Sequence, residues 1–338
     1  MRILRGTTLM GLALLVATTV SACAGDTDSS PPAATPSASA SSAAVAPDGV
    51  DVTQLEESPV GLLRVGDEVW ATLPLADAVR TEGGVQVPVG STPLRLAQTA
   101  SGVWVSLIRD GAVAQIDPDT DEITRTVRLP RGSEPEGLVA DGSSLWIVDQ
   151  AGDRILEIDA ATGQRRRTVP VADGPRLVTR EGRHIAVSAF VAGTVTVFTV
   201  APCAASCPAP TDRRDLSLPD CFGPQGVTFA GGLLWVACTT SDAVYGVDVA
   251  RDRVVVTVPL DGADAVFTLG DTVLAVGQVG PTVVAIDAAT REAGAPVVLD
   301  SGGAVRENVD LVAVEDTVVV SHPELRRLYD VPLTLLVP

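Results

Sequence analysis

Histidine is almost missing from this sequence, with His184 and His322 the only two among 338 residues. The chain also contains no G-x-S-x-G nucleophile elbow, no H-E-x-x-H zinc motif and no P-loop. These absences disfavour the hydrolases, metalloproteases and nucleotide-dependent enzymes that rely on such motifs. They favour a binding protein over an enzyme, and we expect no cofactor and no bound metal.

Lysine is absent too, so all 24 basic residues are arginine, against 42 acidic residues. The formal net charge is −18 at pH 7. Such an excess of negative charge is repelled by nucleic acid and by anionic lipid surfaces. We therefore expect no nucleic-acid partner, and we expect a soluble, monomeric globular domain.

Long apolar runs are missing after the first 23 residues. Two arginines precede an apolar run over residues 9–20, which has the length of a signal-peptide core. The run ends in Val20-Ser21-Ala22-Cys23, and small residues before a cysteine are typical of a lipoprotein cleavage site. We predict that residues 1–23 are a lipoprotein signal peptide with Cys23 acylated, which places the protein on the extracytoplasmic face of the cell membrane. The alternative is an ordinary cleavage site that happens to abut a cysteine.

Large apolar side chains are almost absent from residues 24–48, which are rich in Ser, Ala, Pro and Thr. A segment of this composition cannot bury enough apolar surface to offset the entropy lost on ordering. We predict a disordered linker there and a folded domain over residues 49–338.

The folded domain is dominated by a motif that occurs seven times, in which a turn residue precedes the centre of a short apolar strand by eleven positions. Successive motifs begin 34 to 49 residues apart. A period near 40 with short strands is typical of a β-propeller, so we predict an all-β, seven-bladed β-propeller with four antiparallel strands per blade. The pairs are Pro59 and Trp70, Pro93 and Trp104, Pro135 and Trp146, Pro175 and Ala186, Pro224 and Trp235, Asp264 and Ala275, and Asn308 and Val319.

The third unit shows the expected blade, with strands predicted over residues 137–140, 145–148, 154–159 and 167–171. Residues 102–105 followed by 114–120 resemble the bacterial YVTN/NHL-type propeller repeat, in the broad group that includes virginiamycin B lyase-like proteins. This resemblance implies the fold, whereas the group hosts lactonases, lyases, sensors and scaffolds. No catalytic residue carries over, because no residue-level motif matches. The tryptophan-docking repeats of quinoproteins are absent, which disfavours a cofactor carrier.

Two segments could supply the last strand of the seventh blade and close the ring. Residues 50–55 could complete that blade from the N-terminal side, and residues 333–337 could do so from the C-terminal side. We favour the N-terminal segment, because pairing the chain ends removes an open sheet edge.

The four cysteines of the folded domain predict two disulfides, as is usual in exported proteins. Cys221 and Cys238 flank a predicted hairpin and should lie opposite each other. Cys203 and Cys207 would then close a small loop in the longest repeat unit. A zinc site is the alternative, but the spacing lacks paired C-x2-C knuckles.

The tryptophans occupy the same phase in four units, which indicates packing anchors between blades rather than a binding box. Residues 117–122 resemble the start of a calcium loop but lack its glycine and closing glutamate, so we predict a solvated turn. His184 should be exposed beside the second strand of the fourth blade.

The residues expected at the channel mouth follow the turn residue or the second strand of each unit. We predict that this rim binds a small molecule or a partner protein, without catalysis. The alternative is a lyase or lactonase in which His322 acts with Glu136 or Asp149, with a divalent cation as a further option. The predicted binding residues are Arg95, Glu136, Asp149, Arg176, Gln225, Asp264, Gln278 and Asp310.

Overall fold

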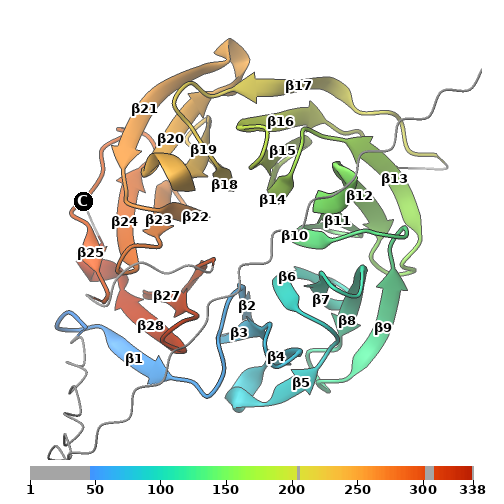
Figure 1. Cartoon of the computed structure of the whole chain (residues 1–338), viewed down its shortest axis with the longest axis horizontal. Helices are drawn as coiled ribbons and strands as arrows, with labels where there is room; N and C mark the ends of the chain where they lie inside the picture. Colours follow the sequence, from blue (N-terminus) through green and yellow to red (C-terminus); the bar gives the residue numbers. More distant parts are fainter. Residues whose placement is uncertain (1–45, 204–205, 301–307, 337–338) are drawn as a thin grey trace, which may run out of the picture. The chain divides into compact units, whose positions relative to one another are not determined.

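The computed structural model describes residues 46–203, 206–300 and 308–336. These residues form seven four-stranded antiparallel sheets arranged as blades around a central channel (Figure 1). The predicted seven-bladed propeller is therefore confirmed. Within this part of the chain no helix has the length and hydrophobicity needed to cross a membrane. The predicted signal peptide, Cys23 and almost all of the predicted linker lie outside the described residues.

The first four blades each use four consecutive strands, ordered from the channel outward. Blade 1 consists of β2 (Leu62–Val65), β3 (Glu68–Leu73), β4 (Ala78–Arg80) and β5 (Gln86–Pro88). Blade 2 consists of β6 (Pro93–Thr99), β7 (Gly102–Leu107), β8 (Ala112–Ile116) and β9 (Ile123–Arg128). Blade 3 consists of β10 (Pro135–Asp141), β11 (Ser144–Asp149), β12 (Arg154–Asp159) and β13 (Arg165–Pro170). Blade 4 consists of β14 (Pro175–Glu181), β15 (His184–Ala189), β16 (Thr194–Thr199) and β17 (Thr211–Ser217).

The remaining blades follow the same order until the ring closes. Blade 5 consists of β18 (Pro224–Ala230), β19 (Leu233–Cys238), β20 (Ala243–Asp248) and β21 (Arg253–Pro259). Blade 6 consists of β22 (Ala263–Leu269), β23 (Thr272–Gly277), β24 (Thr282–Asp287) and β25 (Val297–Val298). Blade 7 consists of β26 (Leu311–Val314), β27 (Thr317–His322), β28 (Arg327–Pro332) and β1 (Asp51–Gln54). Short 3-10 turns are η1 (Glu82–Gly84), η2 (Gln150–Gly152), η3 (Thr239–Ser241), η4 (Val249–Arg251) and η5 (Leu333–Leu335).

The N-terminal strand closes the ring, as predicted. β1 pairs antiparallel with β28, joining Asp51 to Asp330 and Gln54 to Arg327 (Figure 1, blue beside red). The rival segment instead begins with the 3-10 turn η5. Closure by β1 covers the edge of β28 with backbone hydrogen bonds, and it ties residues 271 positions apart through the Gln54 side chain and the Leu325 carbonyl (2.9 Å).

The tryptophans pack between blades, as predicted. Trp70, Trp104, Trp146 and Trp235 are at most 1% exposed. Trp104 lies in one apolar cluster with Leu145 and Ile147 of the next blade. Removing such a buried tryptophan costs about 3–5 kcal/mol of stability, so the repeated Trp phase accounts for much of the cohesion of the ring.

Buried hydroxyls form a second, polar link between blades. Ser321 accepts a hydrogen bond from the Asp310 amide (2.9 Å) and donates one to the Val60 carbonyl of the next blade (2.8 Å). Each bridge satisfies backbone groups that would otherwise be buried without partners. Two further hydroxyls bridge in the same way, Ser188 to the Gln225 carbonyl (2.6 Å) and Thr72 to the Leu94 carbonyl (3.1 Å).

The inner strands of neighbouring blades approach too closely for a side chain at some positions. A Cβ atom added to Gly137 would lie 2.6 Å from the Arg176 carbonyl oxygen, and one added to Gly61 would lie 2.1 Å from that of Leu94. Glycine at these positions therefore allows close packing around the channel.

Both predicted disulfides are present. Cys221 and Cys238 lie at the ends of the predicted hairpin with 5.5 Å between their Cα atoms, and both are buried. Cys203 and Cys207 join within the connection between β16 and β17, with 4.3 Å between their Cα atoms.

Antiparallel strands divide the connections between two faces of the propeller. The second-to-third-strand connections and the links between blades lie on one face, which we call the loop face. The first-to-second and third-to-fourth connections lie on the opposite face. β1 starts at Asp51 near the opposite face, because Asp51 pairs with Asp330 and not with Arg327 at the loop-face end of β28.

Candidate functional site

Six of the predicted binding residues lie at the channel end of the inner strands. Each lies among the first three residues of the first strand of its blade or, for Asp310, directly before that strand, where the chain enters from the loop face. Arg95, Glu136, Gln225 and Asp264 are nevertheless buried, with Arg95 only 6% exposed. The predicted rim is thus mostly a buried layer, which comprises Arg95, Glu136, Arg176, Gln225, Asp264 and Asp310.

An ion pair joins two blades across a third. Arg95 of blade 2 donates from Nη1 to Oδ2 of Asp310, the residue preceding β26 of blade 7, at 2.9 Å. Blade 1 lies between blades 7 and 2, and it has a glycine, Gly61, at the equivalent position. No side chain at that position therefore separates Arg95 from Asp310. Burial acts to lower the pKa of Arg95, but the surrounding carboxylates, above all Asp310, outweigh it and raise the pKa. Arg95 is therefore a permanent cation in the channel.

A second ion pair lies in the adjacent blades. Arg176 of β14 donates to Glu136 of β10 at 2.9 Å, and the Arg176 guanidinium lies 5.4 Å from the centroid of the Phe190 ring. This cation–π contact and the carboxylate fix the guanidinium on the channel side of blade 4.

Asp264 is a channel carboxylate with a strongly raised pKa. Burial raises its pKa to about 7, against the opposing attraction of Arg95. Its Oδ2 accepts from the Val309 amide of the next blade (2.7 Å), and the Gln278 side chain also bonds the carboxyl. The channel layer holds two arginines, Arg95 and Arg176, and three carboxyl groups, those of Glu136, Asp264 and Asp310. A proton on Asp264 therefore brings the net charge of these five side chains to zero.

The channel layer retains unused hydrogen-bonding capacity. Buried atoms without a hydrogen-bond partner among the described residues include Arg95 Nε and Nη2, Glu136 Oε1 and Asp264 Oδ1. A cavity of about 140 Å³ lies along the channel walls beside Arg95 and Asp310. Its size and the free Arg95 donors suit water or a very small polar ligand.

Asp149 lies away from the channel layer. Its carboxylate accepts from the Ser133 hydroxyl (2.8 Å), the Glu134 amide (2.9 Å) and the Arg154 guanidinium (2.7 Å). These contacts hold the connection between blades 2 and 3, which is a structural use of the carboxylate.

His322 lies at the loop-face end of β27 and is buried. Its Nδ1 lies 3.4 Å from the Leu325 amide and 3.8 Å from a Glu324 carboxylate oxygen, and its ring centroid is 6.2 Å from that of Tyr329. Burial lowers the pKa of His322, so the ring is neutral at pH 7. No contact within the described residues joins His322 to Glu136 or Asp149. Its proposed catalytic role stays a prediction.

The structure also places two other polar positions for which the sequence made a prediction. His184 is exposed at the start of β15, as predicted. Residues 117–122 form the turn between β8 and β9, where the Asp117 carboxylate accepts from the Asp119 amide (2.9 Å). That bond is the one expected of a solvated turn.

The loop face carries a larger cavity that the sequence did not indicate. It has a volume of about 610 Å³ and is lined by connections of blades 1, 2 and 7. Leu75 is 80% exposed there, and Arg109 is exposed without a polar partner among the described residues. Loops with no repeat pattern form this cavity, so no periodic signal could have located it. Its lining includes Val60, Leu75, Leu94, Arg109, Glu324 and Arg326.

No protein-family model and no curated protein matches the chain. Solved structures do match. The fold is similar to that of a catalytically inactive histidine-to-alanine variant of virginiamycin B lyase from Staphylococcus aureus with quinupristin, with a TM-score of 0.67 and 14% identity over 83% of this chain and 98% of that one.

Two further structures show the same likeness. A streptogramin B lyase structure has a TM-score of 0.67 at 14% identity, covering 83% of this chain and 96% of that one. Kuenenia stuttgartiensis hydrazine synthase has a TM-score of 0.56 at 16% identity, covering 70% and 75%. At these identities the likeness shows the propeller fold alone.

Proposed function

We propose that this protein is a non-catalytic binding module of the cell envelope, held at the membrane by an acylated Cys23 and the linker over residues 24–48. The observation that carries the proposal is the loop-face cavity of about 610 Å³, within the range of small-molecule sites. The channel supports the same assignment, since Arg95, Asp310, Arg176 and Glu136 are engaged there in ion pairs between blades.

The lining of the cavity favours a ligand with an apolar body and one anionic group. Leu75, Leu94 and Val60 supply apolar surface, and Arg109 supplies a guanidinium that forms no ion pair within the described residues. Arg326, in contrast, already donates to the Glu56 carbonyl (2.9 Å). The cavity also contains two carboxylates, but that of Asp77 accepts from the Thr92 amide (2.8 Å) and that of Glu324 lies 3.8 Å from His322. Arg109 is therefore the residue best placed to bind a carboxylate or phosphate.

The position of β1 is compatible with a membrane tether. The chain enters β1 near the opposite face, so a tether attached there leaves the loop face free for a ligand or a partner protein.

Titration with decanoate, an amphiphilic carboxylate, tests the ligand class. We expect saturable binding by isothermal titration calorimetry, weakened at least about tenfold in Arg109→Glu because the charge at the site is reversed. Arg131→Glu is the matched control, since Arg131 is also an exposed arginine in a loop-face connection. Equal weakening in both variants would indicate a general charge effect and contradict the site.

Fractionation of cells tests the anchor separately. Cys23→Ser should release the protein from the membrane fraction, and continued retention would contradict lipidation.

A propeller lyase or lactonase is the second candidate, favoured by the likeness in fold to virginiamycin B lyase. In this case His322 would act as general acid or base after exposure on substrate binding. The test is turnover of a streptogramin B depsipeptide and its loss in His322→Ala. Activity that persists in His322→Ala would exclude this residue as the catalyst.

A further inference from the structure

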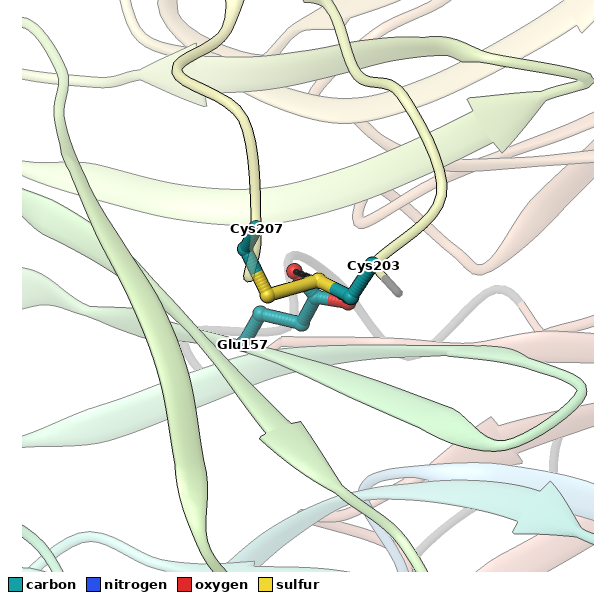
Figure 2. Close-up of side chains that lie close together, drawn as sticks. All are labelled: Glu157, Cys203 and Cys207. Atoms are coloured by element: carbon teal, nitrogen blue, oxygen red, sulfur yellow. Dashed lines mark hydrogen bonds between the residues drawn. A yellow bond between two sulfur atoms is a disulfide. The ribbon is translucent and has the colours of Figure 1, made fainter. Parts of the chain in front are cut away.

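The two disulfides have different surroundings. Cys221 and Cys238 are buried in an apolar cluster of blades 4 and 5. Cys203 and Cys207 are half-exposed in the connection between β16 and β17, on the opposite face. Figure 2 shows this second disulfide against the carboxylate of Glu157. A thiol in solution can therefore reach Cys203–Cys207 but not Cys221–Cys238.

Arg167 of β13 contacts one sulfur of the exposed disulfide. Its Nη2 donates to Cys203 Sγ at 2.8 Å and to the Ala201 carbonyl at 3.0 Å. The guanidinium also lies 5.5 Å from the centroid of the Trp146 ring. These contacts fix a positive charge next to Cys203 Sγ, where it would stabilise a thiolate.

Glu157 of β12 holds Arg167 in place. Its Oε2 lies 2.5 Å from Arg167 Nε, and its Oε1 accepts from the Ser144 hydroxyl at 2.7 Å. The same two oxygens lie 3.8 and 3.9 Å from Cys203 Sγ. The carboxylate thus positions the arginine while its own charge opposes a thiolate at Cys203.

The two sulfurs are inequivalent as a result. Cys203 Sγ has a guanidinium as neighbour. Cys207 Sγ forms no hydrogen bond among the described residues, and a Glu157 carboxylate oxygen lies within 4.8 Å of it. In thiol–disulfide exchange, the sulfur that leaves as the more stable thiolate leaves faster. Attack is therefore favoured at Cys207, with departure of Cys203.

We propose that Cys203–Cys207 is a thiol–disulfide exchange site that accepts electrons from a dithiol, such as that of a partner protein. A thiolate of the dithiol attacks Cys207 Sγ, a new S–S bond forms there, and Cys203 leaves as a thiolate beside Arg167. The second thiol of the dithiol, after losing its proton to solvent, attacks the mixed disulfide. The dithiol is oxidised by two electrons, and Cys207 leaves as a thiolate. This site does not depend on the ligand proposed for the loop face.

The charges around Cys203 predict opposite effects of two substitutions. Arg167→Gln removes the charge that stabilises the leaving thiolate, so opening should slow about tenfold. Glu157→Gln removes the opposing negative charge, so opening should accelerate about threefold. If Arg167 and Glu157 only held the β16–β17 connection in place, either substitution would loosen that connection, and the disulfide would open faster in both variants. Arg165→Gln, an exposed site with the same charge change on the same strand, is the control and should behave as wild type.

The measurement uses the folded, oxidised protein with dithiothreitol, followed by alkylation of new thiols and mass spectrometry. We expect Cys203–Cys207 to open at least about a hundredfold faster than Cys221–Cys238, because the buried pair opens only after local unfolding. Arg167→Lys should recover part of the rate by keeping the charge. Joint opening of both disulfides, or faster opening in Arg167→Gln, would overturn the proposal.

A second measurement on the unsubstituted protein keeps the proposal testable if the Arg167 variant does not fold. A brief exposure to reduced glutathione traps the first mixed disulfide. Peptide mapping should place at least about four-fifths of the adduct on Cys207, because Cys203 is the favoured leaving group. Equal adducts on Cys203 and Cys207, or a majority on Cys203, would overturn the assigned direction.

Discussion

The channel layer and the loop-face cavity both contain arginines and carboxylates, but they use them differently. In the channel, Arg95 is 6% exposed and pairs with Asp310 of a distant blade. In the cavity, Arg109 is exposed and has no polar partner among the described residues. Polar residues of the regular inner strands therefore stabilise the ring, whereas residues of the irregular connections are free to bind a ligand. Substitutions in the two regions should accordingly separate stability from binding.

The largest expected effect concerns the proton on Asp264. Its pKa is about 7 in the folded protein and near 4 in the unfolded chain, so the folded state alone holds this proton between those values. The contribution of Asp264 to the free energy of unfolding is greatest below pH 4. It falls by up to about 4 kcal/mol as the pH rises to 7 and above. Asp264→Asn removes this dependence.

Chemical denaturation at pH 4 and pH 8 measures that effect. The stability of Asp264→Asn relative to the unsubstituted protein should rise by up to about 4 kcal/mol between the two pH values. Subtracting the two proteins removes contributions from other titrating groups. A difference that does not change with pH would show that Asp264 is ionised in the folded state, and it would contradict the neutral channel layer.

The ion pair across blade 1 should have the next largest effect. Asp310→Asn keeps a side-chain acceptor for the Leu62 amide but leaves Arg95 buried without its partner charge. We expect a loss of about 3 kcal/mol in urea denaturation. Combining it with Arg95→Met should recover part of the loss, since the uncompensated charge is gone. Strictly additive losses would mean that the two residues do not interact.

The hydroxyl bridge of Ser321 should contribute less. Ser321→Ala leaves the Asp310 amide and the Val60 carbonyl without this partner, at an expected cost of about 1–2 kcal/mol. Ser217→Ala, at an exposed position of β17 with no side-chain hydrogen bond among the described residues, serves for comparison. Unchanged stability in Ser321→Ala would indicate that other groups satisfy the freed backbone.

The smallest effect on stability is expected in the loop-face cavity. Arg109→Glu should change the free energy of unfolding by no more than about 0.5 kcal/mol, because Arg109 is exposed and unpaired. If Arg109→Glu lowered the free energy of unfolding as much as Asp310→Asn does, Arg109 would stabilise the ring, and the two regions would not differ in the way described.

The repeat predicted most of the fold because each blade is specified locally. In blade 3 the predicted strands agree with β10, β11, β12 and β13 to within two residues at every end. The phase of Trp146 also predicted its packing between blades correctly. The bridging hydroxyls were missed, although Thr72, Ser188 and Ser321 share one register two residues after the strand centre. That shared register in otherwise apolar strands was the signal available.

The channel residues were identified without their partners. Arg95, Glu136 and Asp264 were expected as an accessible rim, but the close approach of the inner strands buries them. Asp149 was grouped with them because it ends a second strand, and its pairing with Arg154 and Ser133 became visible only in three dimensions. The repeat pattern shows where a residue lies within its own blade. It does not show which charged residue of another blade lies next to it.

The sequence by itself determined the seven blades, the strand order within each blade, the tryptophan anchors and the pairing of the cysteines. These features depend on turns, alternation and spacing within about 50 residues. Only the tertiary structure decided that Arg95 pairs with Asp310, 215 residues away, that burial raises the pKa of Asp264 to about 7, and that Arg167 lies against Cys203. The pairing of Arg95 with Asp310 arises because the ring closes through β1 and brings distant blades into a shared, low-dielectric interior, where charges interact strongly. Arg167 and Cys203, in contrast, meet between the adjacent blades 3 and 4.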